Sequence, residues 1–412
     1  MTALRFSNLI SPMLLAALAL SAAPAIAEVY VQCPGDINGD AIPDGPPPPG
    51  VAGPVKCKHL AGGDGYAMMA NGDRKYIFSF SDVTGIPEAD VIDTAAVGAN
   101  LPAPSIIVDE GDKLYLTLSN VGLVIRPDLF DPHSVHYHGF PNAASAFDGL
   151  PETSIVINPG ASLTYFYANV EPGTYLYHCH VEATEHMQMG MVGSLHVYPR
   201  QDRCGTGGRP ACPAGVTAGL RYAYNDGDGS TRFDVEVPIL MSSFDPTFHD
   251  ASFHVQPLPF ADMRDQYFLL NGRGYPDTVV TGPFAAPAVD PDGAPLDGKA
   301  SQPVSSRITA TAGQRVLLRI ANLSVTDYAT IGTIGIPMRV IARDARLLQG
   351  GDGTKQYYTT NSVTLGGGES ADVILDTTGV SAGRYFLYTT NLNRLANAAE
   401  NFGGQMTEIR VN

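Results

Sequence analysis

Histidines are unevenly distributed along this 412-residue chain, and their pattern is typical of a metal site. Of the ten histidines, six fall between residues 133 and 186. Three lie in the segment HSVHYHG: His133, His136 and His138. The others lie in HCHVEATEHMQMGM with sulfur-bearing neighbours: His178, Cys179, His180, His186 and Met191. Imidazole, thiolate and thioether groups bind transition metals. Two H-x-H pairs, one with an intervening cysteine, rarely arise in histidines that only fill a core or a surface.

The sulfur-containing part of this pattern predicts an inner site with four ligands: His133, Cys179, His186 and Met191. Two imidazoles, one thiolate and a weak thioether are the ligand set of a blue-copper electron-transfer site. Copper is favoured over zinc because methionine is an unusual zinc ligand. Met189 is the alternative axial ligand, and Met187 is assigned to packing.

The remaining four histidines predict an outer site: His136, His138, His178 and His180. Side chains alternate between the two faces of a strand, so in TYLYHCHV the thiol of Cys179 points into the core. His178 and His180 then point outward, and His136 and His138 share one face. Since Cys179 is bonded through the backbone to both His178 and His180, an electron could pass between the two sites along a covalent path.

The elements that must hold these residues are strands. Glycine (44) and proline (32) are abundant, and short runs rich in Val, Ile, Tyr, Phe and Thr alternate with turn signals, which indicates an all-β protein. The two halves resemble each other, as in VDEGDKLYLTLSN against TATAGQRVLLRIAN and NVEPGTYLYHCH against GVSAGRYFLYTT. We therefore predict a duplicated β-sandwich. The expected parts are an N-terminal extension at 28–73, a first domain at 74–203, a linker at 204–215 and a second domain at 216–412.

The N-terminus predicts export. Arg5 supplies a positive charge, residues 13–20 are apolar, and Ala25-Ile26-Ala27 fits a signal peptidase site, so residues 1–27 are assigned to a signal peptide. The apolar run is too short and too rich in alanine to favour a membrane anchor. The expected location is the periplasm or the outside of the cell.

Charge restricts the classes of partner. The formal net charge is −16, from 25 basic and 41 acidic residues. Such a surface repels nucleic acid and anionic membranes, so neither nucleic-acid binding nor membrane insertion is expected. It suits cationic partners such as metal ions or basic redox proteins, although solubility alone explains the charge equally well.

The five cysteines are consistent with an oxidising compartment. Cys204 and Cys212 flank a short Gly/Pro loop and are expected to pair, and Cys33 and Cys57 flank another. This leaves Cys179 as a free thiol, which an exported protein rarely keeps without a reason.

The segment DINGDAIPD is the other candidate ion site. It contains alternating oxygen ligands, as in calcium loops: Asp36, Asn38, Asp40 and Asp44. Ala41 stands at the sixth position, where such loops use glycine, and no glutamate closes the loop. A plain Asp/Gly turn is therefore the preferred interpretation, and calcium is the alternative.

Over residues 102–199 the chain resembles the multicopper oxidases and copper nitrite reductases. The resemblance rests on PAPSIIVDEGDKLYLTLSN, HYHGF, FDGLP, INPGASLTYFY, PGTYLYHCH and MGMVGSLHVY, and continues in the second half with GQRVLLRIANLS, MRVIARDA and LGGGESADVIL. It implies two cupredoxin-like Greek-key β-sandwich domains, the second without a blue copper of its own. It also implies a homotrimer like that of two-domain members of the family.

The same resemblance assigns roles to residues. The inner four would be the blue-copper ligands, His136 a type 2 copper ligand, and His138, His178 and His180 type 3 ligands. Asp148, in FDGLP, would relay protons to oxygen as a catalytic acid. A turn residue before Gly149 is the alternative interpretation for Asp148.

The chain departs from the family pattern in two places: the gap from His180 to His186 is longer than the family's usual three residues, and the second half lacks expected histidines. Where two further H-x-H pairs are expected it reads IGTIGIPMRVIA and LYTTNLNRLAN, so a complete eight-histidine trinuclear cluster cannot be built. A nitrite-reductase arrangement would need a third histidine from a neighbour, for which only His249 and His254 are available in the second half. His59 and His196 are assigned structural roles.

The favoured function is a copper-dependent oxidoreductase. A donor (a phenol, a metal ion or a small redox protein) would be oxidised at the inner copper, and an acceptor such as O₂ reduced at the outer site. The alternatives are a non-catalytic copper-binding or electron-transfer protein and a nitrite-reductase-like enzyme.

Overall fold

The structure is a computed structural model in which strands predominate, as the sequence predicts. It describes six stretches of the chain: residues 29–51, 53–141, 143–169, 171–285, 287–296 and 299–412. The predicted signal peptide, 1–27, lies outside these residues. Within them, no helix is both long enough and apolar enough to cross a membrane.

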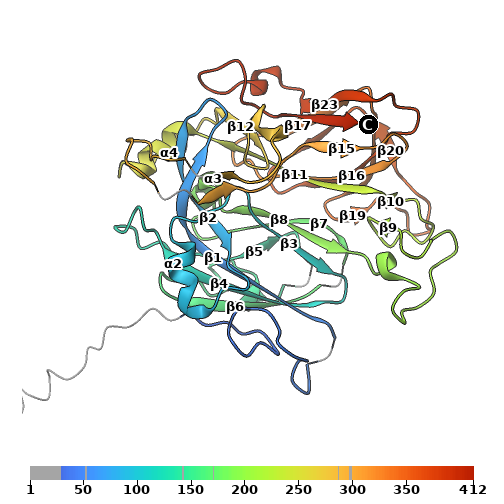
Figure 1. Ribbon diagram of the computed structural model, residues 1–412, viewed down its shortest axis with the longest axis horizontal. Coiled ribbons are helices and arrows are strands. Elements are labelled where there is room, and N and C mark those ends of the chain that lie inside the picture. Colours follow the sequence, from blue (N-terminus) through green and yellow to red (C-terminus); the bar gives the residue numbers. More distant parts are fainter. Residues whose placement is uncertain (1–28, 52, 142, 170, 286, 297–298) are drawn as a thin grey trace, which may run out of the picture.

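The first half of the chain forms two four-stranded sheets, drawn in blue to green in Figure 1. Their orders are β2–β1–β4–β6 and β3–β8–β7–β5. The strands are β1 (Val55–Met68), β2 (Arg74–Asp82), β3 (Ala103–Asp109), β4 (Lys113–Gly122), β5 (His136–His138), β6 (Ser162–Ala168), β7 (Gly173–His178) and β8 (Val192–Tyr198). Short helical segments connect them: η1 (Glu88–Asp90), α2 (Val91–Ala95), η2 (Ser145–Phe147), α3 (Ala183–Met189) and η3 (Arg200–Arg203). Alternate residues of these strands fill one apolar core, among them Leu116, Tyr167 and Tyr177.

The predicted N-terminal extension is too long. We placed residues 28–73 outside the first sandwich, but β1 lies inside it, antiparallel to β2 and parallel to β4. The sequence of β1, VKCKHLAGGDGYAM, is polar and rich in glycine, which is unlike a typical strand. It is nevertheless largely buried because it is the second strand of its sheet.

The second half forms two larger sheets, with orders β12–β11–β16–β22–β18–β19 and β15–β24–β23–β17–β21. β20 pairs with β18, and β9/β10 and β13/β14 are separate ribbons. The strands are β9 (Arg221–Tyr222), β10 (Arg232–Phe233), β11 (Val235–Phe244), β12 (Tyr267–Leu270), β13 (Phe284–Ala285), β14 (Ala300–Gln302), β15 (Ile308–Ala310), β16 (Arg315–Asn322), β17 (Ala329–Ile334), β18 (Met338–Arg343), β19 (Arg346–Leu347), β20 (Tyr358–Thr360), β21 (Ser362–Leu365), β22 (Ser370–Asp376), β23 (Gly383–Thr389) and β24 (Met406–Val411). The helical segments are α4 (Pro246–Phe253), η4 (Phe260–Asp262), η5 (Asp277–Val279) and η6 (Leu392–Leu395).

The two halves repeat one topology. In the first, β4 lies between the parallel strand β1 and the antiparallel strand β6; in the second, β16 lies between the parallel strand β11 and the antiparallel strand β22. The other sheets correspond in the same way, β3–β8–β7–β5 to β15–β24–β23–β17. The predicted duplication is therefore present, and it allows positions in one half to be compared with those in the other.

The halves pack closely against each other. β7 contacts β16 and β22, β8 contacts β11, and α4 of the second half covers β2 of the first, as Figure 1 shows for the yellow helix beside the blue strand. The fully buried guanidinium of Arg319 donates to the hydroxyl of Thr174 across this boundary, at 3.0 Å. The strand that ends in His178 thus lies directly at the boundary between the halves.

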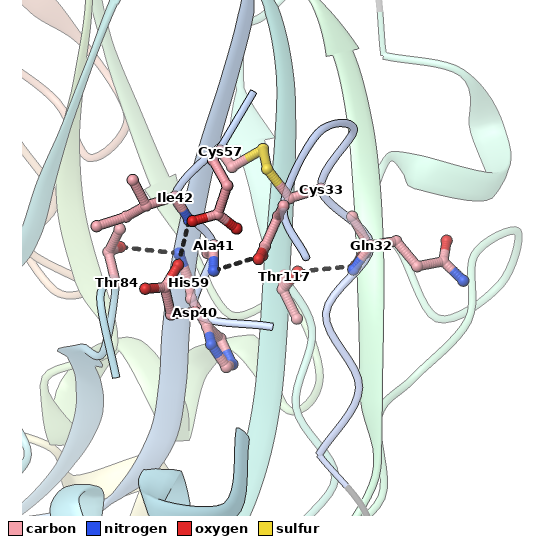
Figure 2. The surroundings of a disulfide bond; sticks show 12 residues. Gln32, Cys33, Asp40, Ala41, Ile42, Cys57, His59, Thr84 and Thr117 are labelled. Carbon is pink, nitrogen blue, oxygen red and sulfur yellow. Dashed lines mark hydrogen bonds between the residues drawn. A yellow bond between two sulfur atoms is a disulfide. The ribbon is translucent and has the colours of Figure 1, made fainter. Parts of the chain in front are cut away.

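Both predicted disulfides are present, Cys33–Cys57 and Cys204–Cys212, and Cys179 is free and buried. Figure 2 shows how the first attaches the N-terminal segment to β1, beside the bond from the backbone N–H of His59 to Thr84.

The loop that could have held calcium is closed by its own backbone. Asp36 accepts hydrogen bonds from the N–H groups of Gly39 and Ala41, both at 2.8 Å, and Asp40 accepts one from Ile42, also 2.8 Å. These contacts form Asx turns, which occur with or without a bound ion, so the turn and the calcium site both stay predictions.

Candidate metal centres

Three of the predicted inner ligands converge in the core of the first sandwich. The donor atoms of His133, Cys179 and His186 all lie within 4.8 Å of one another, and the three side chains are buried. His186 Nδ1 is 3.0 Å from Cys179 Sγ. His133 is held by a bridge to Ile157, and Cys179 directly follows β7. Residues far apart in sequence therefore form one compact donor set.

Helix α3 explains the long gap between His180 and His186. Its seven residues bring the chain back over the end of β7, with His186 in the last turn and Gly190 ending the helix at φ 120°. The backbone N–H of Met191 then bonds to His186, and the carbonyl of Met191 accepts from the N–H of Cys179. The insertion thus forms a local helix and leaves the site intact.

Two of the three methionines near the inner site share the surroundings of Cys179. Met191 and Met189 are both fully buried in the same core cluster as Cys179. Met187 instead packs in a separate cluster with Leu176 and Val192.

The environment of Cys179 favours the thiolate, the form that binds metals. Burial alone disfavours a charged sulfur, but the imidazoles of His186 and His133 outweigh it and lower the pKa of Cys179 to about 5. The backbone N–H of Ser134 also points at the sulfur, 3.4 Å away.

The ring nitrogens of His133 are the strongest indication that a metal ion binds at this site. It is completely buried, yet neither of its ring nitrogens has a hydrogen-bond partner. Buried polar atoms without partners are rare in folded proteins. A copper ion fits the donor set of His133, Cys179 and His186 and would satisfy such a nitrogen.

Two contacts at this site were missed from sequence. Asp131 Oδ1 lies 3.0 Å from His186 Nε2, the ring nitrogen that faces away from Cys179. A carboxylate on the far nitrogen orients a metal-binding imidazole and increases its basicity. In β1, a Cβ on Gly62 would lie 2.7 Å from the ring of His133. Two features of the sequence could have indicated these contacts: Asp131 lies two residues before His133, and β1 contains several glycines.

The predicted outer histidines also gather. The donor atoms of His136, His138 and His178 lie within 4.8 Å of one another, because β5 and β7 pair with His136 opposite His178. His180 lies beside this group, its ring centroid 5.1 Å from that of His136 and 5.5 Å from that of His178.

Backbone carbonyls determine which nitrogens of this cluster are free. His136 Nδ1 lies 2.6 Å from the carbonyl oxygen of Asp148, and His178 Nδ1 lies 2.7 Å from that of Cys179. Each ring therefore uses Nδ1 as a donor and keeps a lone pair on Nε2. Burial lowers the pKa of His178 to about 3, so its imidazole is neutral and able to bind a metal over the physiological range.

Asp148, the predicted proton relay, lies next to this cluster. Its carboxylate oxygen Oδ1 is 3.5 Å from His136 Nδ1, and the side chain is half-buried. It also ends the short helix η2. The position allows both interpretations that the sequence left open, the relay and the turn.

The duplicated topology identifies the positions of the second half that correspond to the outer histidines. Register equates Gly173 with Gly383, because each pairs with the last valine of its neighbouring strand, Val197 and Val411. His178 then corresponds to Tyr388, and His136, its partner, to Gly332. By the same register, none of the four outer positions is a histidine in the second half: Gly332, Ile334, Tyr388 and Thr390.

The candidate third ligands lie elsewhere. His249 is fully buried and its ring nitrogens lie 2.6 Å and 3.0 Å from the carbonyls of Tyr76 and Gln188, so it is not accessible to a neighbouring subunit. His254 is exposed and lies 3.2 Å from Asp292. His59 bonds to Ser119, and His196 is buried beneath Arg319 and Glu236.

Comparison with known proteins agrees with this geometry. Residues 83–202 and residues 258–407 each match a family model described as multicopper oxidase. A laccase from Metarhizium acridum (strain CQMa 102) is 31% identical over 123 residues, which cover 29% of this chain and 19% of that protein. An L-ascorbate oxidase from Cucurbita maxima is 23% identical over 313 residues, 74% of this chain and 46% of that protein. The matches therefore span less than half of either relative.

Solved structures show the same fold. A blue copper oxidase from Nitrosomonas europaea aligns with a TM-score of 0.60 and 20% identity, over 87% of this chain and 86% of that one. A copper nitrite reductase from Nitrosomonas europaea aligns with a TM-score of 0.54 and 17% identity, over 87% and 94%. The fold class predicted from sequence, paired cupredoxin sandwiches, is confirmed. With both sandwiches matched by family models, the chain belongs to the multicopper oxidase family, whose members bind copper.

Proposed function

We propose that the protein is a copper-dependent oxidoreductase that oxidises a donor at the inner site and reduces an acceptor, O₂ being the favoured one, at the outer site. The observation that carries this proposal is the buried thiolate of Cys179, set between His133 and His186 and joined through the backbone to His178 and His180. A single peptide bond joins Cys179 to each of these histidines, and this connection is the proposed path for electrons.

The side chains have distinct roles in this proposal. Cys179, His133, His186 and Met191 would hold the inner copper, and the outer histidines would hold the second site. Copper, when bound, supplies one-electron transfer. The rigid sandwich keeps the ligands fixed, and the core around Cys179 excludes water. Asp148, beside His136, is the proposed source of protons for the acceptor.

The donor is proposed to approach over α3. An open depression of about 430 Å³ there is lined by Glu182, Glu185 and Phe260. Two of its lining residues carry carboxyl groups, Glu182 and Glu185; burial, together with the negative charges of Glu182 and Asp131, raises the pKa of Glu185 to about 7, so this group carries only part of its charge at neutral pH. This composition suits cationic donors such as metal ions, and phenols that pack on an aromatic ring.

The proposal is tested by loading the full chain with copper and measuring metal content, optical and EPR spectra, and oxygen uptake with a phenolic donor. We expect an intense visible band and oxygen consumption that depends on the donor. A blue protein that consumes no oxygen with phenols, Cu(I), Fe(II) or Mn(II) would contradict the oxidase proposal, and if it also failed to reduce nitrite it would be an electron-transfer protein.

Removing the charge of Asp131 should change the redox properties of the inner site. In Asp131→Asn we expect the reduction potential to rise, because a negative charge 3.0 Å from His186 Nε2 stabilises the more positive oxidised state. The visible band should remain, since no ligand is lost. Redox titration measures the shift, and Asp128→Asn, whose exposed carboxylate pairs with Arg126, is the control. Equal potentials in both variants would contradict a role for Asp131.

Nitrite reduction is the second candidate. It is favoured by the small outer cluster of histidines and by their absence from the equivalent positions of the second half, features that do not match a complete trinuclear site. Turnover of nitrite with a reduced donor, and none of O₂, would support it.

Location and assembly are also proposed. The two disulfides support an oxidising compartment, periplasmic or extracellular. The partial exposure of His136 and His180 supports an assembly, a homotrimer by family resemblance, in which a neighbour covers the outer site.

A further inference from the structure

The second half contributes to the outer site through a glycine. A Cβ on Gly368 would lie 2.4 Å from His138 Nε2 and 2.6 Å from the adjoining Cε1. Because such distances are shorter than any real contact of a Cβ atom, only glycine permits His138 its present position. A cavity of about 30 Å³, roughly the space of one water molecule, adjoins this contact between His138, Thr174 and Ser370.

The segment that carries Gly368 is firmly held. Gly368 donates its N–H to the carbonyl of Asn322 at 2.8 Å, and Asn322 donates its own to the carbonyl of Glu369 at 3.0 Å. The carboxylate of Glu369 accepts from the N–H of Gly366 at 2.6 Å, which closes the turn on itself. Asn322 is buried and also bonds to Leu365. The backbone segment that contacts His138 is therefore held in place by these hydrogen bonds and does not move aside.

The contact with Gly368 determines which nitrogen of His138 is available. Its Nε2 lies against Gly368, whereas its Nδ1 faces the cluster, 3.4 Å from His178 Nε2. His136 and His178 have the opposite arrangement, with Nδ1 engaged by backbone carbonyls and Nε2 free. A ring nitrogen of each histidine lies within 4.8 Å of those of the other two, so the three rings face one position.

We infer that the outer site holds a single metal ion, bound by His136, His138 and His178, and that Gly368 of the second half fixes the position of His138. The inference rests on the proposed function in assuming that the outer histidines bind copper. Paired metals lie about 3.5–4 Å apart, and each needs its own ligands. Three rings already face one position, only His180 is left over, and the equivalent positions of the second half supply no histidine.

The first test counts metals in the copper-loaded full chain. One outer metal predicts two copper ions per chain, both visible by EPR, because neither has a second copper close enough to couple with. A third copper, or a pair that is silent by EPR, overturns the inference. Neither result depends on turnover, so the inference can fail while oxidase activity is retained, and activity can be absent while the copper count agrees.

The second test is Gly368→Ala with Gly313→Ala as its matched control. Both glycines have left-handed backbones, at φ +91° and +89°, but a Cβ on Gly313 meets nothing within 4 Å. The two variants therefore share the same backbone strain, and only Gly368→Ala displaces His138. Titration with Cu²⁺ should show a ten- to hundredfold loss of affinity at the outer site in Gly368→Ala, with the visible band of the inner site unchanged. Wild-type affinity in Gly368→Ala, or equal losses in both variants, would contradict a positioning role.

Discussion

Cys179→Ser is expected to abolish the intense visible absorption of the copper-loaded protein and to reduce donor oxidation to background. The thiolate is the one sulfur anion in the donor set, and its pKa, lowered to about 5, makes it available at neutral pH. A serine hydroxyl is not ionised at that pH and is a poor ligand for copper. The outer histidines are untouched, so EPR should still detect copper there.

The control variant makes the same cysteine-to-serine substitution elsewhere in the chain. Cys204→Ser/Cys212→Ser removes a disulfide that closes a surface loop of the connecting segment, far from the core that contains Cys179. This variant should retain its visible band. If the band persisted in Cys179→Ser, or disappeared equally in the control, the assignment of Cys179 as the copper ligand would be wrong.

Much of the candidate site could be predicted from sequence because its chemistry is concentrated in two short segments. The alternation of residues along a strand was enough to separate Cys179 from His178. The strand itself ends at His178, one residue before the cysteine, but the alternation of directions continues. The free thiol followed from pairing the other four cysteines, and the structure has both of those disulfides.

What the sequence did not reveal depends on contacts between distant segments. Asp131 became significant only when α3 turned the far nitrogen of His186 toward it. Gly62 and Gly368 matter because of the rings they contact, His133 and His138; the glycines are visible in the sequence, but the rings that they contact are not. The strand β1 was missed for a similar reason: its burial comes from pairing with β4, not from its own composition.

The boundary between the two halves contains another set of contacts between distant segments, and these contribute to stability. Arg319 is fully buried there and pairs with Glu236 and Asp372, while its Nη1 donates to Thr174 of the first half. Arg319 holds the pKa of Glu236 at about 2, although burial alone would raise it. Removing one partner of a buried ion pair leaves uncompensated charge in the interior. We therefore expect Arg319→Leu to lower the free energy of unfolding by about 3–5 kcal/mol, as measured by urea denaturation of the metal-free chain.

The pH dependence of this loss distinguishes an electrostatic cause from poor packing of leucine. The pKa of Glu236 is lower when folded than when unfolded, so its stabilisation is present above its unfolded value and is lost as pH falls toward 2. Without Arg319, Asp372 favours its protonated form, and its burial costs least at low pH. The difference between wild type and Arg319→Leu should therefore be larger at pH 7 than at pH 4. Arg346→Leu breaks a pair with Glu171 in which both side chains are exposed and should cost at most about 1 kcal/mol. A loss in Arg319→Leu that is independent of pH, or no greater than that of Arg346→Leu, would show that the ion pairs of Arg319 do not stabilise the fold.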